Sequence, residues 1–150
     1  MNILSSYLEQ HSVKAEILCF DQSTRTCADA AALLNVPLSS IVKTVILIDD
    51  QKRTLAAIIP GNKRVDLSKI CAELGLKRVR IAPPEEVFKR TGYEAGAVPP
   101  LGFQALFILD AHIKGEVYAG GGTTNSLLKI HVKELERMVN PVMLDVSKHE

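Results

Sequence analysis

The stretch Ser40-Ile41-Val42-Lys43-Thr44-Val45-Ile46-Leu47-Ile48 decides how this chain is organised. It ends in an unbroken run of four apolar residues, three of them β-branched, which is typical of a strand buried on both faces. Lys43 stands at the entrance to that run. A lysine in this position either turns its ammonium group to water or holds it at the edge of the core for a purpose. We therefore expect a central strand with a charged entrance.

Length and composition limit the possible classes. With 150 residues, 47% of them apolar, the chain is predicted to form one domain over 1–150. Lysine and arginine number 18 against 17 acids, so the net charge of +1 argues against non-specific duplex binding but allows a local basic strip for a single-stranded RNA end. No membrane span or secretion signal is evident. The odd set of three cysteines, Cys19, Cys27 and Cys71, indicates thiols in a reducing cytoplasm.

Hydrophobic periodicity predicts alternating helices and strands. Thr26 and Asp66 are expected to cap helices, and Gly75 to end one. We expect a hairpin connection at 49–52 and a strand end at 60–64. Hairpins recur, so the predicted fold is α/β (α+β), a curled, mixed, mostly antiparallel sheet flanked by helices. The expected helices are 3–10, 28–34, 67–74, 84–91 and 132–138, and the expected strands are 15–20, 41–48, 55–59, 79–81, 105–110, 116–119, 127–130 and 142–146.

Several common catalytic motifs are missing from the sequence. It has no Gly-x-Ser-x-Gly elbow, phosphate loop or His-Glu-x-x-His. Asp110 and His112 would share a strand face, but two candidate ligands at modest spacing favour a solvent-facing or hydrogen-bonded pair over a metal site. Cys27 lies at a predicted helix start, where a thiolate is favoured, yet a small buried residue is the better interpretation. No metal or cofactor is predicted.

Four features remain as functional candidates. Lys43 alone is weak evidence, because a lysine at a strand end is ordinarily solvated. The loop 96–102, stiffened by prolines, is either a rigid surface loop or a holder of outward-facing main-chain N–H groups. The glycines at 120–122 exceed what a turn requires, which suggests close approach of a ligand. Lys63-Arg64, with Lys52-Arg53, forms either a solvated face or a set of phosphate contacts.

Taken in order, the chain resembles a known family. The segments that carry the resemblance are Thr26-x-x-x-Ala30-Ala31, Ile41-Val42-Lys43-Thr44, Pro60-Gly61, Thr91-Gly92-Tyr93, Gly96-Ala97-Val98-Pro99-Pro100-Leu101-Gly102 and Val117-Tyr118-x-Gly120-Gly121-Gly122. They are similar to those of the YbaK/ProX family of free-standing aminoacyl-tRNA deacylases, which are related to the editing domain inserted in bacterial prolyl-tRNA synthetases. The resemblance spans nearly the whole chain. It implies a pocket for the aminoacylated 3′ end of tRNA and hydrolysis of a mischarged ester.

The resemblance also assigns expected roles to residues. Lys43 matches the family's catalytic-site lysine, and Gly96 begins its Gly-x-x-x-Pro loop and is expected to act in catalysis with it. Ala97 departs from the second glycine common in relatives, and the segment 123–126 lacks the charged residues of some members, which leaves the amino acid that is removed undetermined. Thr44 resembles the YbaK type, where the alanine-specific type usually has asparagine. The expected substrate-binding residues are Thr26, Thr44, Gly61, Ala97, Val98, Pro99, Pro100, Gly120, Gly121 and Gly122.

The residues suggest a mechanism that agrees with this resemblance. Ester hydrolysis places negative charge on the carbonyl oxygen, which main-chain N–H groups near Gly96 or Gly121 are expected to stabilise. A protonated Lys43 would hold the terminal phosphate or ribose hydroxyls and orient the ester. No protein nucleophile is visible, so water is the expected attacker, helped by the ribose hydroxyl of the substrate or, for a cysteinyl ester, by its own thiol.

Two other functions fit the same residues. A non-catalytic module would bind aminoacyl-tRNA or a synthetase without releasing the amino acid. A small-ester hydrolase would act without needing the tRNA body. The near-neutral charge agrees with both alternatives, because tRNA-binding proteins are often more basic. The resemblance makes cysteine or alanine on the tRNA for proline the candidate ester and prolyl-tRNA synthetase a candidate partner, and it leaves the oligomeric state open.

Overall fold

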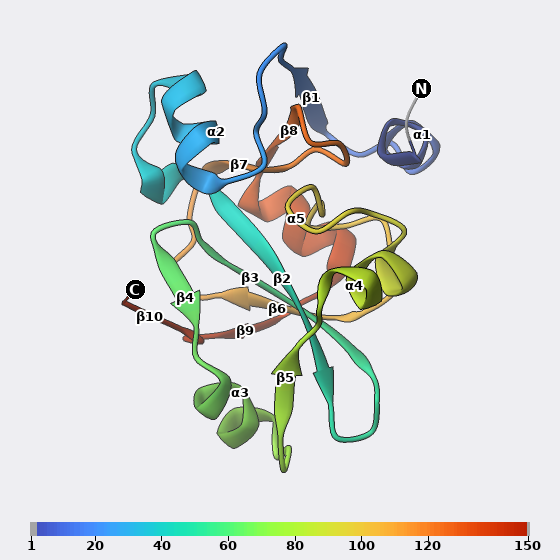
Figure 1. Ribbon diagram of the computed structural model, residues 1–150, viewed down its shortest axis with the longest axis vertical. Coiled ribbons are helices and arrows are strands. Elements are labelled where there is room, and N and C mark those ends of the chain that lie inside the picture. Colours follow the sequence, from blue (N-terminus) through green and yellow to red (C-terminus); the bar gives the residue numbers. More distant parts are fainter. Residues whose placement is uncertain (1–2, 150) are drawn as a thin grey trace.

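A computed structural model describes residues 3–149 of the chain (Figure 1). Each helix is short and amphipathic or alanine-rich, as the sequence pattern requires. Two helices begin at the expected caps, where Thr26 accepts a hydrogen bond from the N–H of Asp29 and Asp66 from that of Lys69. The helices are α1 (Ile3–Gln10), α2 (Cys27–Leu34), α3 (Leu67–Leu74), α4 (Pro84–Thr91) and α5 (Val132–Val139), with a 3-10 turn, η1 (Leu38–Ser40).

The strands form two sheets and a separate ribbon. The larger sheet has the order β5-β2-β3-β6-β9, the smaller one the order β1-β8-β7, and β4 pairs with β10. Pairing is antiparallel except between β3 and β6 and between β6 and β9. The strands are β1 (Ala15–Cys19), β2 (Val42–Asp49), β3 (Thr54–Pro60), β4 (Lys63–Val65), β5 (Val79–Ile81), β6 (Leu106–Asp110), β7 (Glu116–Gly120), β8 (Ser126–His131), β9 (Val142–Leu144) and β10 (Ser147–His149).

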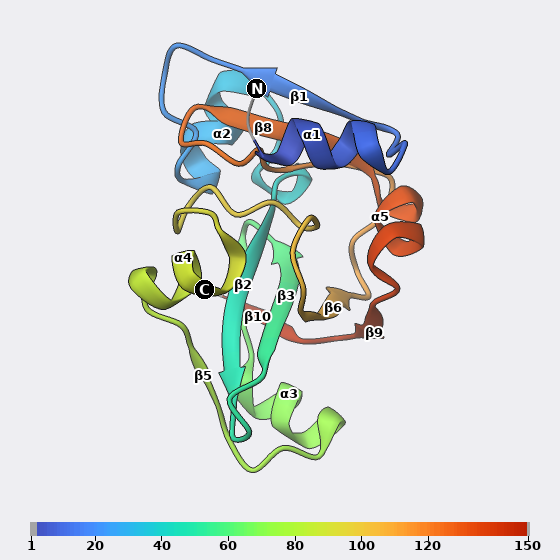
Figure 2. The same ribbon diagram turned by 90° about the vertical axis from the view of Figure 1, so that its right-hand side faces the viewer.

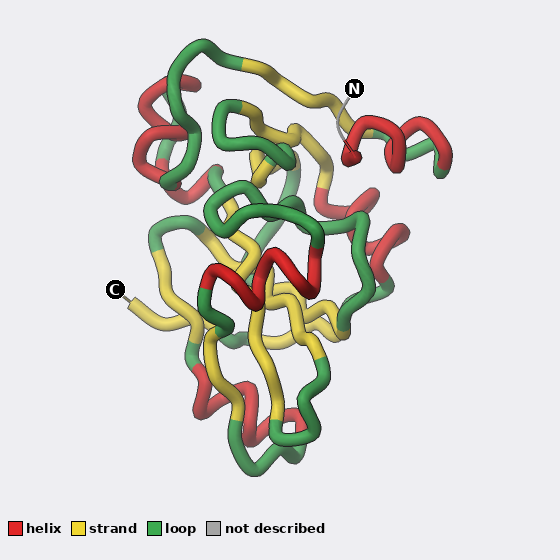
Figure 3. Tube along the Cα trace, turned by 45° about the vertical axis from the view of Figure 1, so that its right-hand side comes forward, coloured by secondary structure: helices red, strands yellow, loops and turns green. Residues whose placement is uncertain are grey.

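The two sheets are stacked along the long axis of the molecule. Figure 2 shows the three-stranded sheet with α1 at the top, the five-stranded sheet below it and α3 at the lower end. An isolated parallel bridge between Ile41 and Tyr118 links the start of β2 to β7. The long loop after α4, a green segment in Figure 3, runs between the sheets, and its residues Val98 and Leu101 are buried there. The loop is therefore part of the core as well as of the surface.

Two of the three apolar clusters hold most of these layers. The larger cluster joins α1, α5 and both sheets through Leu4, Ile58, Leu109, Leu128 and Leu135, none of which is more than 1% exposed. The smaller cluster packs α3 against the other face of the five-stranded sheet. Burial on this scale is the main favourable term in folding. Val42, the first residue of β2, belongs to the larger cluster, and the preceding Ile41 packs with Ala30 and Leu127 in the third.

The predicted mixed, mostly antiparallel fold is confirmed, with three local differences. The sheet is divided in two. The expected strand 142–146 ends at Leu144, and a further strand, β10, begins at Ser147. The expected strand end at 60–64 overlaps β4, which pairs with β10. β4 has only three residues, two of them charged, and its partner lies more than 80 residues away, so local sequence patterns do not reveal it.

Candidate active site

A cavity lies where the two sheets meet. Its volume is about 520 Å³, a size suited to a small-molecule or nucleotide ligand. It is bounded by the start of α2, the first half of β2, the loop after α4 and the end of β7. Segments 24–28, 41–46 and 119–120 contribute to its lining, together with residues 95, 96 and 98 of the loop. Chain segments far apart in sequence thus converge on one hollow.

The cavity exists because one edge of β2 is uncovered. β5 is three residues long and pairs with Leu47–Asp49 only. The Ala82 N–H then donates to the Ile46 carbonyl, and the described residues place no further strand beside Lys43–Val45 on this side. In an antiparallel ladder, the N–H and C=O of alternate residues point to the same side. The main-chain groups of Thr44 therefore point towards the same edge as those of Ile46 and face the cavity.

Lys43 and Thr44 reach this cavity from opposite faces of β2. Thr44 follows Val42 and precedes Ile46 on the face of the larger apolar cluster, whereas Lys43 lies on the face of Val45. Both line the cavity because it wraps around the open edge. The Thr44 hydroxyl is buried, and no described residue hydrogen-bonds to it. A buried hydroxyl without a partner is costly, which makes it a candidate contact for a ligand.

The charged groups of the lining are both cationic. Arg25 and Lys43 line the cavity, and among the described residues that do so there is neither a carboxylate nor a histidine. The start of α2, whose amide dipoles favour negative charge, contributes Cys27 and Ala28. The cavity therefore suits an anionic or strongly polarised ligand. Its lining offers no carboxylate or imidazole as a general base.

Arg25 was not predicted from the sequence. Its side chain covers Gly96, where an added Cβ would lie 2.7 Å from the Arg25 Cγ. Gly96 has φ 88°, a left-handed conformation that favours glycine. The only sequence signal for Arg25 was its place next to the helix cap Thr26. Cys27, which was expected to be buried, is half-buried and lines the cavity.

The three consecutive glycines serve mainly to pack the chain against itself. An added Cβ on Gly120 would lie 2.3 Å from the Val98 carbonyl oxygen, and one on Gly121 would lie 2.6 Å from the main chain at Leu127. The Gly122 N–H donates to the Ala97 carbonyl. The close approach is therefore that of the protein's own backbone at Gly120 and Gly121 and of the Tyr93 and Leu4 side chains at Gly122. Gly120 lines the cavity as well.

Part of the predicted oxyanion stabilisation is wrong. The Gly121 N–H donates to the Ser126 carbonyl and the Ala97 N–H to the Glu94 carbonyl, so both donors are already used inside the fold. The main-chain N–H groups of Gly96 and Val98 have no acceptor among the described residues. Both residues line the cavity, so their N–H groups replace that of Gly121 as the candidate donors.

The structure brings together seven of the residues singled out from the sequence. Lys43, Gly96, Thr26, Thr44, Gly61, Val98 and Gly120 line the cavity. The remaining five, Ala97, Pro99, Pro100, Gly121 and Gly122, are not part of its lining. Ala97, Pro99 and Pro100 are buried, so they anchor the loop in the fold without facing the cavity. The Thr26 hydroxyl accepts a hydrogen bond as the N-cap of α2, so Thr26 contributes to the cavity by fixing the start of that helix.

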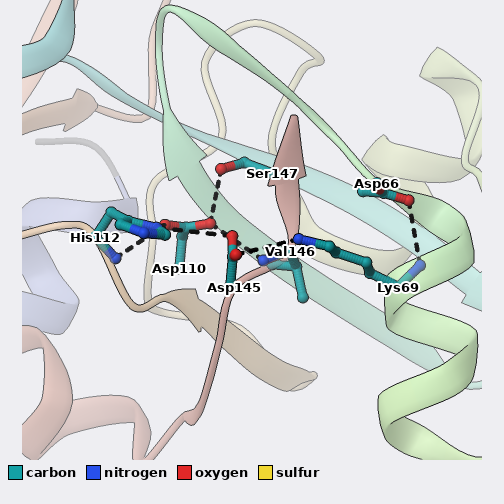
Figure 4. A network of polar contacts seen from close by, with 7 residues as sticks. All are labelled: Asp66, Lys69, Asp110, His112, Asp145, Val146 and Ser147. Carbon is teal, nitrogen blue, oxygen red and sulfur yellow. Dashed lines mark hydrogen bonds and ion pairs between the residues drawn. The ribbon is translucent and has the colours of Figure 1, made fainter. Parts of the chain in front are cut away.

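The Asp110–His112 pair is hydrogen-bonded, as one of the two favoured readings expected (Figure 4). Asp110 Oδ1 accepts from the His112 N–H and lies 3.0 Å from its Nδ1, while Oδ2 accepts from the Val146 N–H and the Ser147 hydroxyl. Burial by itself raises the pKa of Asp110, but these donors outweigh it and hold the pKa below its ordinary value. Although Asp145 lies close enough to complete a metal-sized cluster, both Asp110 oxygens are engaged, Oδ1 with His112 and Oδ2 in tying β6 to β10.

Comparison with known proteins agrees with this geometry. The sequence matches the aminoacyl-tRNA editing domain over residues 21–138. The crystal structure of a hypothetical protein has 34% identity and a TM-score of 0.91, covering 98% of this chain and 100% of that one. The crystal structure of a proposed trans-editing enzyme for prolyl-tRNA synthetase has 28% identity and a TM-score of 0.87, covering 97% of this chain and 95% of that one. A proposed Cys-tRNA(Pro)/Cys-tRNA(Cys) deacylase, EbsC, from Enterococcus faecalis is 28% identical over 102 residues, 67% of this chain and 62% of the relative.

The matches to known proteins indicate a small hydrolase, and its cavity has a lining whose charged side chains are cationic. The chain belongs to the aminoacyl-tRNA editing domain family, the YbaK family predicted from the ordered motifs. Its class of activity is deacylation of aminoacyl-tRNA. Within the described residues, no helix has the length and apolar character needed to cross a membrane.

Proposed function

We propose that this protein is a free-standing editing enzyme that hydrolyses the 3′ ester of tRNA for proline mischarged with cysteine or alanine. The observation that carries the proposal is the convergence of Lys43, Thr44, Gly96 and Gly120 on one cavity with a cationic lining. We place its activity in the cytoplasm, where tRNA is charged. Prolyl-tRNA synthetase is the proposed source of the mischarged substrate, in keeping with the similarity to a proposed trans-editing enzyme for that synthetase.

In this proposal the cavity holds the acylated terminal adenosine. The Lys43 ammonium binds the terminal phosphate or the ribose hydroxyls and so fixes the position of the ester. The main-chain groups of Thr44 at the open edge of β2, and its hydroxyl, offer hydrogen bonds to the amino acid or the ribose. Fixing the reacting atoms in this way lowers the barrier without a covalent intermediate.

The attacking group in the proposed reaction is water. The lining contains no carboxylate or histidine, so the proton of the water passes to the substrate's own ribose hydroxyl or to bulk solvent. The N–H groups of Gly96 and Val98 stabilise the negative charge that develops on the carbonyl oxygen. The ester bond breaks, and the free amino acid and the 3′ hydroxyl of the tRNA are released.

The amino acid has to fit an apolar end of the cavity. Val42, Ile46, Val87 and Val98 contribute methyl groups there, and such walls distinguish side chains by size only weakly. A small side chain such as that of cysteine or alanine therefore agrees with this lining. Discrimination against proline itself would require exclusion by shape.

A panel of charged tRNAs tests this proposal. The purified protein is incubated with tRNA for proline carrying cysteine, alanine or proline, and release of the labelled amino acid is followed over time. The expected result is rapid release of cysteine or alanine and retention of proline. Tight binding without release would identify a binding module instead, and equal hydrolysis of short esters that lack the tRNA body would identify a small-ester hydrolase.

A further inference from the structure

The ribbon of β4 and β10 carries cations in an arrangement that the fold itself does not need. Arg64 lies directly opposite Lys148, and Lys63 opposite His149. Arg64 and Lys148 are exposed. Like charges in directly opposed positions of an antiparallel pair are destabilising. A two-stranded ribbon of three residues a strand gains little stability to offset that repulsion.

No carboxylate among residues 3–149 forms an ion pair with Lys63, Arg64 or Lys148. Two acids of the described residues that flank the ribbon in sequence are already engaged. Asp66 accepts from the main chain at the start of α3, and Asp145 pairs with Lys69. Within residues 3–149, the positive charge of the ribbon therefore faces solvent and is open to an external anion.

The ribbon also continues directly from the cavity. Gly61 lines the cavity, and Lys63 follows it after one intervening residue, at the end of the tight turn between β3 and β4. In Figure 1, β4 descends from the turn that lies beside the start of β2 and below α2. A chain that leaves the cavity on the Gly61 side would therefore pass over the ribbon.

We propose that the β4–β10 ribbon docks the phosphate backbone of the tRNA acceptor end. This inference rests on the proposed function, because it requires the acylated terminal adenosine to occupy the cavity. The nucleotides before that adenosine then carry their phosphates over Lys63, Arg64 and Lys148. Phosphate contacts of this kind position a nucleic acid without reading its sequence. They also explain how a protein of net charge +1 holds a polyanion.

The other cationic pair predicted from the sequence serves as an internal control. Lys52-Arg53 lies in the turn that closes the β2–β3 hairpin, so it does not share a surface with Lys63-Arg64. Seven paired positions, about 20 Å of strand, separate the closed end of this hairpin from its open end at Pro60. Lys77 lies at the closed end too, because its N–H donates to Asp50.

Two double charge reversals test the inference. Arg64→Glu/Lys148→Glu changes the ribbon, and Lys52→Glu/Lys77→Glu makes the same change in net charge at the closed end of the hairpin. Each variant is measured on mischarged tRNA and on an aminoacyl ester of adenosine alone. The ribbon variant is expected to lose roughly tenfold or more in kcat/KM on tRNA, through KM, with a shallower dependence on salt. Its activity on the adenosine ester should equal that of the wild type.

Specific results would overturn the inference. Unchanged kinetics of the ribbon variant on tRNA, or an equal loss in the control variant, would contradict a docking role for the ribbon. A loss that occurs only in the presence of prolyl-tRNA synthetase would assign the ribbon to a protein partner. If the wild-type protein releases no amino acid from any substrate, the proposed function fails. The docking role of the ribbon is then tested by measuring the binding of uncharged tRNA. The ribbon variant should bind it more weakly than the wild type, and the control variant should bind it equally well.

Discussion

The two ends of β2 differ in whether their buried polar groups have hydrogen-bond partners in the described part of the protein. At the closed end, Asp49 accepts hydrogen bonds from the main chain of Gln51 and Arg53 and from the Arg53 guanidinium. Burial alone raises the pKa of Asp49, but these donors outweigh it and leave the pKa below its ordinary value. At the open end, the Thr44 hydroxyl is buried without a partner among the described residues, and main-chain groups face a cavity. Polar groups that satisfy one another hold the fold, and those left facing a hollow are available to a ligand.

This contrast predicts that substitutions at the two kinds of site separate activity from stability. The largest effect is expected for Lys43→Ala. Loss of the ammonium group that positions the ester should reduce kcat/KM on mischarged tRNA by roughly 100-fold or more, a size typical of lost positioning and charge stabilisation. The melting temperature should change little, because Lys43 is half-buried at a strand entrance.

Lys77→Ala is the matched control for Lys43→Ala, since it removes an exposed lysine from the other end of the hairpin. It should retain wild-type activity. Lys43→Arg tests whether charge alone suffices, and it should recover only part of the activity because a planar guanidinium cannot reproduce the ammonium geometry. Full turnover by a folded Lys43→Ala variant would remove Lys43 from the reaction.

The second prediction concerns Asp110, whose two carboxylate oxygens both accept hydrogen bonds within the fold. Asp110→Ala leaves the Ser147 hydroxyl and the Val146 N–H without their acceptor. Buried donors left unpaired cost about 1–3 kcal/mol each, so urea unfolding should show a loss of about 2–4 kcal/mol. Activity per folded molecule should be retained. Asp145→Ala, at a side chain that is 52% exposed, should cost less than about 1 kcal/mol.

The third prediction sharpens the comparison at the open edge. Thr44→Val keeps the shape of the side chain and removes a buried hydroxyl that has no protein partner. Stability should stay equal or rise slightly, because the cost of burying that hydroxyl disappears. Activity should fall roughly tenfold, as expected for loss of one ligand hydrogen bond. A destabilised Thr44→Val variant with full activity would show that the hydroxyl serves the fold.

The smallest effect is a dependence of stability on acid pH. The Arg137 guanidinium and then the Lys14 N–H lower the pKa of Glu134 from about 4.5 to about 2. A carboxyl group whose pKa is lowered by folding stabilises the fold above its unfolded pKa, and that contribution is lost as the pH falls through the folded value. Stability should therefore decline between about pH 4.5 and pH 2.

Glu134→Gln tests the source of this acid dependence. The variant should be less stable than the wild type at neutral pH and should show a flatter decline over the same acid range. Chemical unfolding followed at several pH values measures both quantities. An identical pH profile in the wild type and the variant would show that other carboxyl groups, such as Asp110, account for the acid sensitivity.

Local signals in the sequence were sufficient to predict the helices and most of the strands. Thr26 and Asp66 mark helix starts because their side chains accept hydrogen bonds within four residues, and such contacts are visible in a short window. The ribbon was missed, since β4 and β10 are stabilised by each other across the chain. Its charged residues were noticed, but their cross-strand pairing depends on a register that no local pattern fixes.

The sequence predicted many of the residues that form the site, but less of how they are arranged in space. Lys43 and Gly96 were found from ordered motifs, whereas the open edge of β2 depends on where β5 stops. Arg25 became a candidate only once its side chain was seen to cover Gly96. The role expected of Gly121 failed because its N–H is used by Ser126, a bond within the turn that precedes β8.

The central claim is that the ester is bound at the open edge of β2. The most direct measurement is an NMR titration with an adenosine that carries alanine through a non-hydrolysable 3′ amide. The account predicts shifts of the amide signals of Thr44, Gly96 and Gly120, with those of Asp110 and Glu134 unchanged. Shifts confined to residues outside the cavity, with Thr44 and Gly96 unaffected by saturating ligand, would contradict it.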